Sequence, residues 1–171
     1  MSGTRPGGKE AVIFDDDHYY MGSVLAELLV KDGIAVTYVT PASIAAAYTV
    51  NTMEQKFIQA RLIERGVAII TSQALSAIAA DGLVTSCIYT GKERRHETAS
   101  IILVTSRRPE DALYRALKDR GTAVTAIGDA WAPAAIAHAV YAGRRFAEEF
   151  ETKPRDILEV PFRREIIALA D

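Results

Sequence analysis

Apolar and polar positions follow one another along the chain in blocks of two lengths, which predict strands separated by helices. Apolar runs of strand length lie at residues 11–14, 34–39, 67–70 and 100–104. Between the first three runs the apolar residues recur at helical spacing, and each helical stretch ends at a glycine, Gly33 or Gly66. This strand–helix–strand–helix–strand order favours a parallel sheet with crossover helices.

The pattern changes after the third apolar run, where three short pieces are separated by turn residues. The pieces and their turns are, in order, Leu75–Ala79, Asp81-Gly82, Leu83–Thr90, Gly91-Lys92 and Arg94–Thr98. This spacing predicts an antiparallel three-stranded meander. We predict that the charged run from Lys92 to His96, with its histidine, is a solvated hairpin.

The remainder of the chain predicts two helices, one more strand and an irregular end. A helix is predicted between Pro109 and Arg120, a strand over 124–127, and a second helix from Pro133. We therefore predict an α/β fold, with a Rossmann-like parallel sheet, an antiparallel three-stranded meander and an irregular C-terminal tail. The predicted parts are a disordered lead over 1–9, a Rossmann-like NAD(P)/FAD-type domain over 10–150 and a C-terminal extension over 151–171.

Composition narrows the classes of partner. The 171 residues carry a formal net charge of −2 and a single cysteine, Cys87. The near balance of charge gives no electrostatic case for nucleic acid or an anionic membrane, and no apolar run is long enough to span a bilayer. One cysteine forms no internal disulfide, zinc cluster or iron–sulfur site. We expect a cytoplasmic protein without a metal site.

The turn after the first predicted strand carries three carboxylates, Asp15 to Asp17, where dinucleotide-binding folds carry glycines. Only Gly22 lies near the expected place, and like charges at about 4 Å repel by roughly 4 kcal/mol near a protein surface. The second strand is followed by Thr40 rather than by the acid that holds a ribose. We therefore predict that the chain alone has no millimolar-or-better affinity for NADH.

The same acids also suggest magnesium, which acidic pairs after a first parallel strand hold in bacterial receiver domains. That site needs an aspartate at the end of the third strand, where this chain has Thr71. We favour a structural interpretation, in which Asp15 to Asp17 cap the following helix and lie in solvent.

A second candidate site is Gly128-Asp129-Ala130, which follows the last predicted strand. Small residues there permit close approach of a ligand, and the carboxylate suits sugar or ribityl hydroxyls. An ordinary strand-to-helix turn explains the same residues equally well, because glycine and aspartate favour turns. No serine, cysteine or histidine lies in a nucleophile motif, so we predict no catalytic residue. We predict that His138 is a satisfied structural histidine, and for Trp131 and Tyr141 we favour core or interface packing over stacking on an adenine.

Several stretches of the sequence resemble one family of flavoproteins. Residues 126–130 resemble the second FAD-binding signature of proteins with two dinucleotide-binding domains, and residues 101–109 resemble the strand and turn that precede it. Residues 17–27, 128–133 and 160–165 are similar to the C-terminal region of trimethylamine and dimethylamine dehydrogenases. The similarity extends over nearly the whole chain from Lys9 and includes the unusual first turn without glycines.

The resemblance implies a part of a larger oxidoreductase. In that family FMN and a four-iron cluster belong to an N-terminal barrel, and a barrel alone takes about 250 residues. The resemblance assigns Gly128, Asp129 and Ala130 to part of an FAD- or ADP-type site, with no cofactor bound firmly by this chain alone. It implies the flavin barrel, in the same or a partner chain, and an electron-transfer flavoprotein as partners. A homodimer stays open, as does a freestanding Rossmann-like module that binds a partner chain without catalysis.

Overall fold

The computed structural model describes residues 7–150, which divide into two compact units. The boundary lies between Ser106 and Arg107, so the described part of unit 1 is residues 7–106 and that of unit 2 is residues 107–150. The predicted Rossmann-like domain over 10–150 therefore spans both units. Residues 1–6 of the predicted lead and the predicted extension over 151–171 lie outside the described residues.

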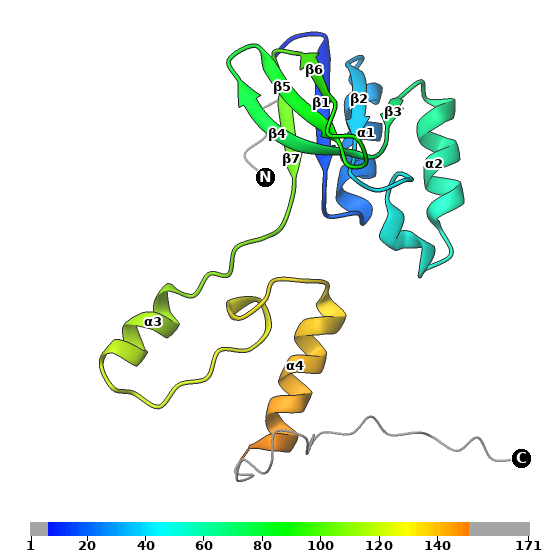
Figure 1. The fold of residues 1–171 in the computed structure, drawn as a ribbon. Helices are drawn as coiled ribbons and strands as arrows, with labels where there is room; N and C mark the ends of the chain where they lie inside the picture. Colours follow the sequence, from blue (N-terminus) through cyan, green and yellow to red (C-terminus); the bar gives the residue numbers. More distant parts are fainter. Residues whose placement is uncertain (1–6, 151–171) are drawn as a thin grey trace, which may run out of the picture. The chain divides into compact units, whose positions relative to one another are not determined.

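Unit 1 is built on a four-stranded parallel sheet with the order β3-β2-β1-β7 (Figure 1). Its strands are β1 (Glu10–Asp15), β2 (Ala35–Val39), β3 (Ala68–Ile70) and β7 (Ile101–Val104). The central strand β1 pairs with β2 on one side and with β7 on the other. The four apolar runs in the sequence therefore became the four strands, and the predicted parallel sheet is confirmed. The same strand order occurs in dinucleotide-binding folds.

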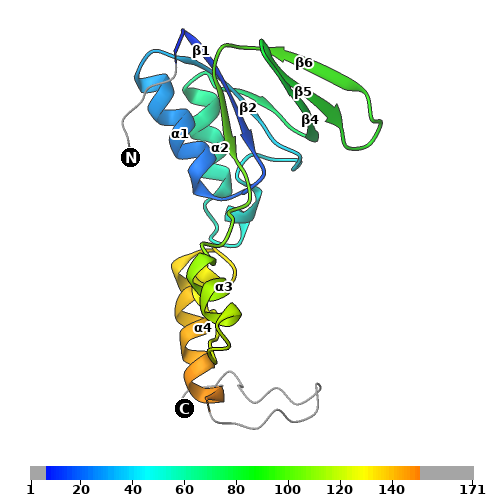
Figure 2. The same cartoon turned by 90° about the vertical axis from the view of Figure 1, so that its left-hand side faces the viewer.

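Two helices cover one face of this sheet, and the turn before the second is also helical (Figure 2). They are α1 (Tyr20–Lys31) and α2 (Gln55–Glu64), with the short 3-10 helix η1 (Ala47–Val50) between them. Gly33 and Gly66 follow the two helices with left-handed φ angles of 79° and 76°, a conformation that glycine adopts without strain.

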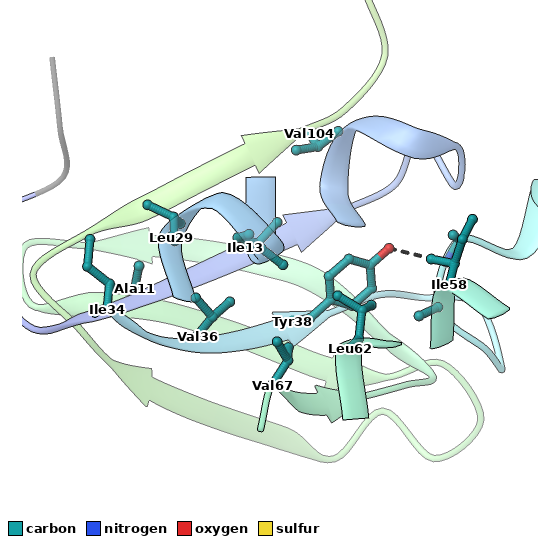
Figure 3. Packing of buried hydrophobic residues seen from close by; sticks show 13 residues of the cluster. Ala11, Ile13, Leu29, Ile34, Val36, Tyr38, Ile58, Leu62, Val67 and Val104 are labelled. Carbon is teal, nitrogen blue, oxygen red and sulfur yellow. Dashed lines mark hydrogen bonds between the residues drawn. The ribbon is translucent and has the colours of Figure 1, made fainter. Parts of the chain in front are cut away.

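The core of unit 1 lies between the helices and the sheet (Figure 3). Ile13 on β1 and Tyr38 on β2 are register partners, and both are completely buried there. Leu62 from α2 packs into the same cluster and is equally buried. Burial of large side chains at this sheet–helix contact is the main term that stabilises the unit.

The predicted meander is confirmed and covers the opposite face of the parallel sheet (Figure 2). Its strands are β4 (Gln73–Ala79), β5 (Gly82–Cys87) and β6 (Glu93–Glu97), in the order β4-β5-β6. Leu83 of β5 is fully buried against Val12 and Phe14 of β1. Unit 1 thus has three layers, in which helices and a meander enclose one parallel sheet.

The prediction that His96 lies on a solvated hairpin is wrong. The β6 register sets His96 opposite Leu83, so both side chains lie on the covered face of the meander. Only 8% of His96 is exposed, and its Nε2 lies 2.9 Å from the hydroxyl of Thr85. Burial, and then the charge of Arg94, lower the pKa of His96 below its ordinary value of 6.5. Lys92 to Arg95 are exposed, as predicted, so His96 is the residue of the charged run that the structure buries.

The described part of unit 2 contains helices but no strand. Its elements are α3 (Ala112–Asp119), the 3-10 turn η2 (Gly128–Ala130) and α4 (Ile136–Glu149). Both helices start three residues after the prolines at which we predicted them, Pro109 and Pro133. The strand predicted over 124–127 is wrong: that segment has no ladder partner among residues 7–150. An apolar run becomes a strand only where a neighbouring strand satisfies its backbone groups.

Every helix within residues 7–150 is too short or too polar to traverse a lipid bilayer.

Candidate functional site

The acidic turn of unit 1 is organised around a buried carboxylate. Asp15 is the last residue of β1 and has no exposed surface. One oxygen of its carboxylate accepts hydrogen bonds from the backbone amides of Asp17 and His18, each at 3.1 Å. The other oxygen accepts a hydrogen bond from the hydroxyl of Tyr38 on β2. Asp15 is therefore satisfied by donors from its own turn and from the neighbouring strand.

This arrangement corrects the prediction that Asp15 to Asp17 cap the helix in solvent. The N-cap position of α1 is Tyr19, and no side chain makes a capping hydrogen bond there. Asp16 is exposed, as predicted, and its carboxylate lies 3.2 Å from Nε2 of His18. Asp15 is inside because β1 continues one residue beyond the apolar run, so its side chain lies on the same face as Ile13.

Helix α1 lies so close to the Asp15 carboxylate that a side chain at position 22 would not fit between them. A Cβ at Gly22, in the first turn of α1, would lie 2.7 Å from Oδ2 of Asp15 and 2.8 Å from its Cγ. Real Cβ atoms essentially never show such distances. Gly22 is therefore required by the carboxylate itself.

Burial raises the pKa of both Asp15 and Tyr38. It raises the pKa of the Asp15 carboxyl above its ordinary value of 3.8, against the opposing effect of the hydrogen bonds it accepts. Burial, and then the negative charge of Asp15, raise the pKa of the Tyr38 phenol. Tyr38 therefore stays a hydrogen-bond donor at neutral pH.

The acids of the turn do not belong to a three-ligand group within residues 7–150. No three histidine, cysteine, aspartate or glutamate side chains come together for metal binding within residues 7–150. The acids of the turn are engaged in other ways: Asp15 accepts protein hydrogen bonds, and Asp16 lies beside His18.

The second candidate, Gly128-Asp129-Ala130, forms the 3-10 turn η2 of unit 2. Gly128 has a left-handed φ of 57°, and its carbonyl accepts hydrogen bonds from the amides of Trp131 and Ala132. Asp129 is exposed, and its carboxylate makes no hydrogen bond or ion pair with the described part of the chain. The backbone of these residues thus forms a turn, as one of the two interpretations predicted, and the Asp129 carboxylate stays available to a ligand.

A largely apolar groove of about 530 Å³ adjoins this turn within unit 2. The segment 124–128 lines it on one side, and α4 lines it through residues such as His138, Arg145 and Phe146. Trp131 also borders it and is 68% exposed, so it is not packed into a core within residues 7–150, and its packing at an interface stays a prediction. His138 is exposed rather than a satisfied structural histidine, and Tyr141 is half exposed.

Unit 2 differs from unit 1 in having no buried residue in its described part, residues 107–150. Seven of its large apolar side chains are exposed by 40% or more: Leu113, Ile127, Trp131, Ile136, Val140, Tyr141 and Phe150. Exposed apolar surface of this density commonly marks an interaction site.

Sequence reasoning found the positions of both candidate turns but missed the environment of Asp15. The available signals were Tyr38, a polar-tipped residue inside an apolar strand, and an acid directly adjoining the apolar run of β1. A buried tyrosine hydroxyl needs a partner, and the adjacent parallel strand is the nearest source.

Comparison with known proteins places the chain among amine-oxidising flavoprotein relatives. Residues 1–108 match the family described as OYE-like second alpha/beta domain. Dimethylamine dehydrogenase of Hyphomicrobium sp. (strain x) is 33% identical over 190 residues, a match that covers 95% of this chain and 25% of that protein.

Two solved structures are similar as well. Histamine dehydrogenase from Rhizobium sp. 4-9 matches with 41% identity and a TM-score of 0.83, over 98% of this chain and 27% of that one. The 6-hydroxypseudooxynicotine amine oxidase from Pseudomonas geniculata N1 matches with 32% identity and a TM-score of 0.75, over 84% of this chain and 22% of that one. The chain thus spans about a quarter of the length of these relatives. It belongs to the family of OYE-like second alpha/beta domains, as found in amine dehydrogenases.

Proposed function

We propose that the chain is the C-terminal dinucleotide-binding-like domain of a flavin-dependent amine dehydrogenase, and that its role is structural or ADP-binding rather than catalytic. Family membership and the 33% and 41% identities to a dimethylamine and a histamine dehydrogenase support this assignment. The absence of a nucleophile motif from the sequence and the internal use of Asp15 support a non-catalytic role.

The observation that carries the proposal is the uncovered apolar surface of unit 2. Ile136 and Val140 lie one helical turn apart on α4 and are 84% and 65% exposed. A segment that buries none of its side chains gains too little from the hydrophobic effect to offset the entropy of ordering its backbone. Residues 107–150 therefore suit a domain that is completed by another part of a larger flavoprotein.

The residues at η2 fit part of an ADP-type site. The free carboxylate of Asp129 suits ribose hydroxyls, which donate hydrogen bonds to it, and the apolar groove beside Gly128 suits a nucleobase. An ADP-type group bound there supplies an anchor and no redox chemistry. In this proposal FMN and the iron–sulfur cluster belong to the flavin barrel, in the same or a partner chain. Electrons leave that barrel to an electron-transfer flavoprotein, the assembly is cytoplasmic, and a homodimer is compatible with it.

ADP binding tests the assignment of η2. We expect calorimetry or equilibrium dialysis to detect weak ADP binding by the 171-residue chain, and Asp129→Ala to abolish it. Asp119→Ala is the matched control, because it removes an exposed acid of unit 2 that belongs to α3 and not to η2. Equal ADP affinity in both variants would remove Asp129 from the site.

The host protein is tested by expressing the chain together with the gene region that surrounds its coding sequence. We expect a flavin-containing protein that retains this chain on purification, and Val140→Asp should weaken that retention by placing a charge on the exposed face of α4. Met53→Asp is the control, since Met53 is 83% exposed in unit 1. A gene region without a flavin barrel would favour the freestanding partner-binding module instead.

A further inference from the structure

The buried carboxylate of Asp15 also bears on whether unit 1 can bind a dinucleotide, whatever larger protein the chain belongs to. We propose that Asp15 is the residue that excludes dinucleotides from this unit, because its carboxylate takes the place beside the first turn of α1 that a pyrophosphate takes in dinucleotide-binding folds. The buried Asp15 side chain and its contacts are sufficient for this exclusion, and the charges of Asp16 and Asp17 are not required.

The position of the carboxylate is the first argument. In the dinucleotide fold the pyrophosphate lies at the N-terminus of the helix after the first strand, where glycines permit close approach. In this chain the atom nearest to a Cβ at Gly22 is Oδ2 of Asp15, at 2.7 Å. Gly22 therefore lets α1 approach the carboxylate of Asp15, which is an anion of the chain itself, where other folds let the helix approach a bound phosphate.

The hydrogen bonds are the second argument. Backbone amides in the turn before the helix are the groups that hold a phosphate in such folds. Here the amides of Asp17 and His18 donate to Oδ1 of Asp15, each at 3.1 Å. A pyrophosphate at this turn would have to take these donors from a carboxylate that is fully buried.

The third argument is that Tyr38, on the adjacent strand, holds the Asp15 carboxylate in place. The Tyr38 hydroxyl donates to Oδ2 of Asp15 from the adjacent strand and also accepts a hydrogen bond from the amide of Ala46. Rotating Asp15 out of the site would leave a buried tyrosine hydroxyl without its acceptor, which is unfavourable. The carboxylate is therefore held in place from outside its own turn, and a nucleotide cannot displace it by moving the turn alone.

The test measures binding of inorganic pyrophosphate and of NADH to the full 171-residue chain. Asp15→Ser vacates the space and the charge, while its hydroxyl can still accept a hydrogen bond from a turn amide. We expect at least about a tenfold gain in pyrophosphate affinity, because the space beside α1 is vacated and the turn amides can donate to an anion. Asp15→Gly is the second variant and should show a gain of the same kind.

Two control variants distinguish the effect of the space that Asp15 fills from the effect of negative charge at the turn. Asp15→Asn keeps the size and the acceptor oxygen and should bind within about twofold of the wild type. Asp16→Asn removes one exposed charge next to the site and should also stay within about twofold, since solvent screens it. An Asp16→Asn gain equal to that of Asp15→Ser would overturn the proposal in favour of general acidity.

A direct measurement on the wild type covers the case in which neither small variant folds. The amide resonances of Asp17 and His18 in a ¹⁵N-labelled chain should not respond to pyrophosphate or NADH. A saturable shift of both would show that the turn accepts an anion with Asp15 present, which overturns the proposal. A folded Asp15→Ser or Asp15→Gly chain that binds no tighter than wild type would also overturn it. None of these outcomes depends on whether the chain is part of an amine dehydrogenase.

Discussion

The hydroxyl of Tyr38 on β2 donates a hydrogen bond to the carboxylate of Asp15 at the end of β1 and accepts one from the amide of Ala46. The second of these is the dashed line in Figure 3. The pair joins two adjacent strands and the segment before η1 through one phenolic oxygen. An acid that would ordinarily be solvated is in this way made part of the core of unit 1.

Tyr38→Phe should lower the free energy of unfolding by about 1.5–3 kcal/mol, because the buried Asp15 carboxylate loses a hydrogen-bond donor. The phenylalanine ring preserves the packing of the tyrosine ring, so the loss reports on the hydrogen bond. Urea denaturation followed by far-UV circular dichroism measures it. Tyr48→Phe removes the hydroxyl of a tyrosine that is 54% exposed and should change stability by less than about 0.5 kcal/mol. Equal effects of the two substitutions would show that the Asp15 contact contributes nothing.

The pH dependence of stability should change in Asp15→Asn. Since the folded protein raises the pKa of Asp15 above the ordinary 3.8, the protonated acid is favoured by folding. The stability contributed by this shift is present below pH 3.8 and is lost as the pH rises through the folded pKa. The unfolding free energy of wild type minus that of Asp15→Asn should therefore decrease as the pH rises above 3.8, in urea titrations at a series of pH values. A difference that increased with pH would contradict the raised pKa.

Gly22→Ala should destabilise unit 1 by about 1–3 kcal/mol, because its Cβ would overlap the Asp15 carboxylate. The clash belongs to one pair of residues, so a double-mutant cycle with Asp15→Ala should be strongly non-additive. Chemical denaturation of the four proteins gives the coupling free energy. An additive cycle would show that Gly22 is required for some reason other than Asp15.

His96 should make the protein less stable in mild acid. Its pKa is lowered in the folded state, so the stability contributed by the neutral imidazole is present above pH 6.5 and is lost as the pH falls through the folded pKa. His96→Gln should remove this part of the pH profile between neutral and mildly acidic conditions. Urea denaturation at a series of pH values measures the profile, and a profile left unchanged by His96→Gln would contradict the lowered pKa.

A chain that ends at Ser106 should fold on its own. Every residue that is buried within 7–150 lies between Ala11 and Val104, and both sheets lie between Glu10 and Val104. Its unfolding free energy should differ from that of the full chain by less than about 1 kcal/mol. Its binding of a fluorescent apolar dye should also be weaker, because the exposed apolar groove of unit 2 is gone. Loss of cooperative unfolding in the truncated chain would show that unit 2 supports unit 1.

Most of unit 1 could be predicted from local pattern. The apolar runs became β1, β2, β3 and β7, and the turn residues at Asp81-Gly82 and Gly91-Lys92 separate the three strands of the meander. These predictions succeed because strand length, helical period and turn chemistry are properties of neighbouring residues. The strand predicted over 124–127 failed because a strand needs a partner, and none is present among residues 7–150.

The sequence by itself determined the parallel strands, the helices and the meander of unit 1 and showed that the first turn is acidic rather than glycine-rich. Only the tertiary structure decided what those acids do. Asp16 is solvated, whereas Asp15 is buried because β2 brings the Tyr38 hydroxyl to its carboxylate and Gly22 lets α1 approach it. His96 changed from a solvated to a buried residue for a similar reason, since the meander register sets it opposite Leu83. The environment of a polar side chain depends on the strand or helix packed against it, and that neighbour can be far away in the sequence.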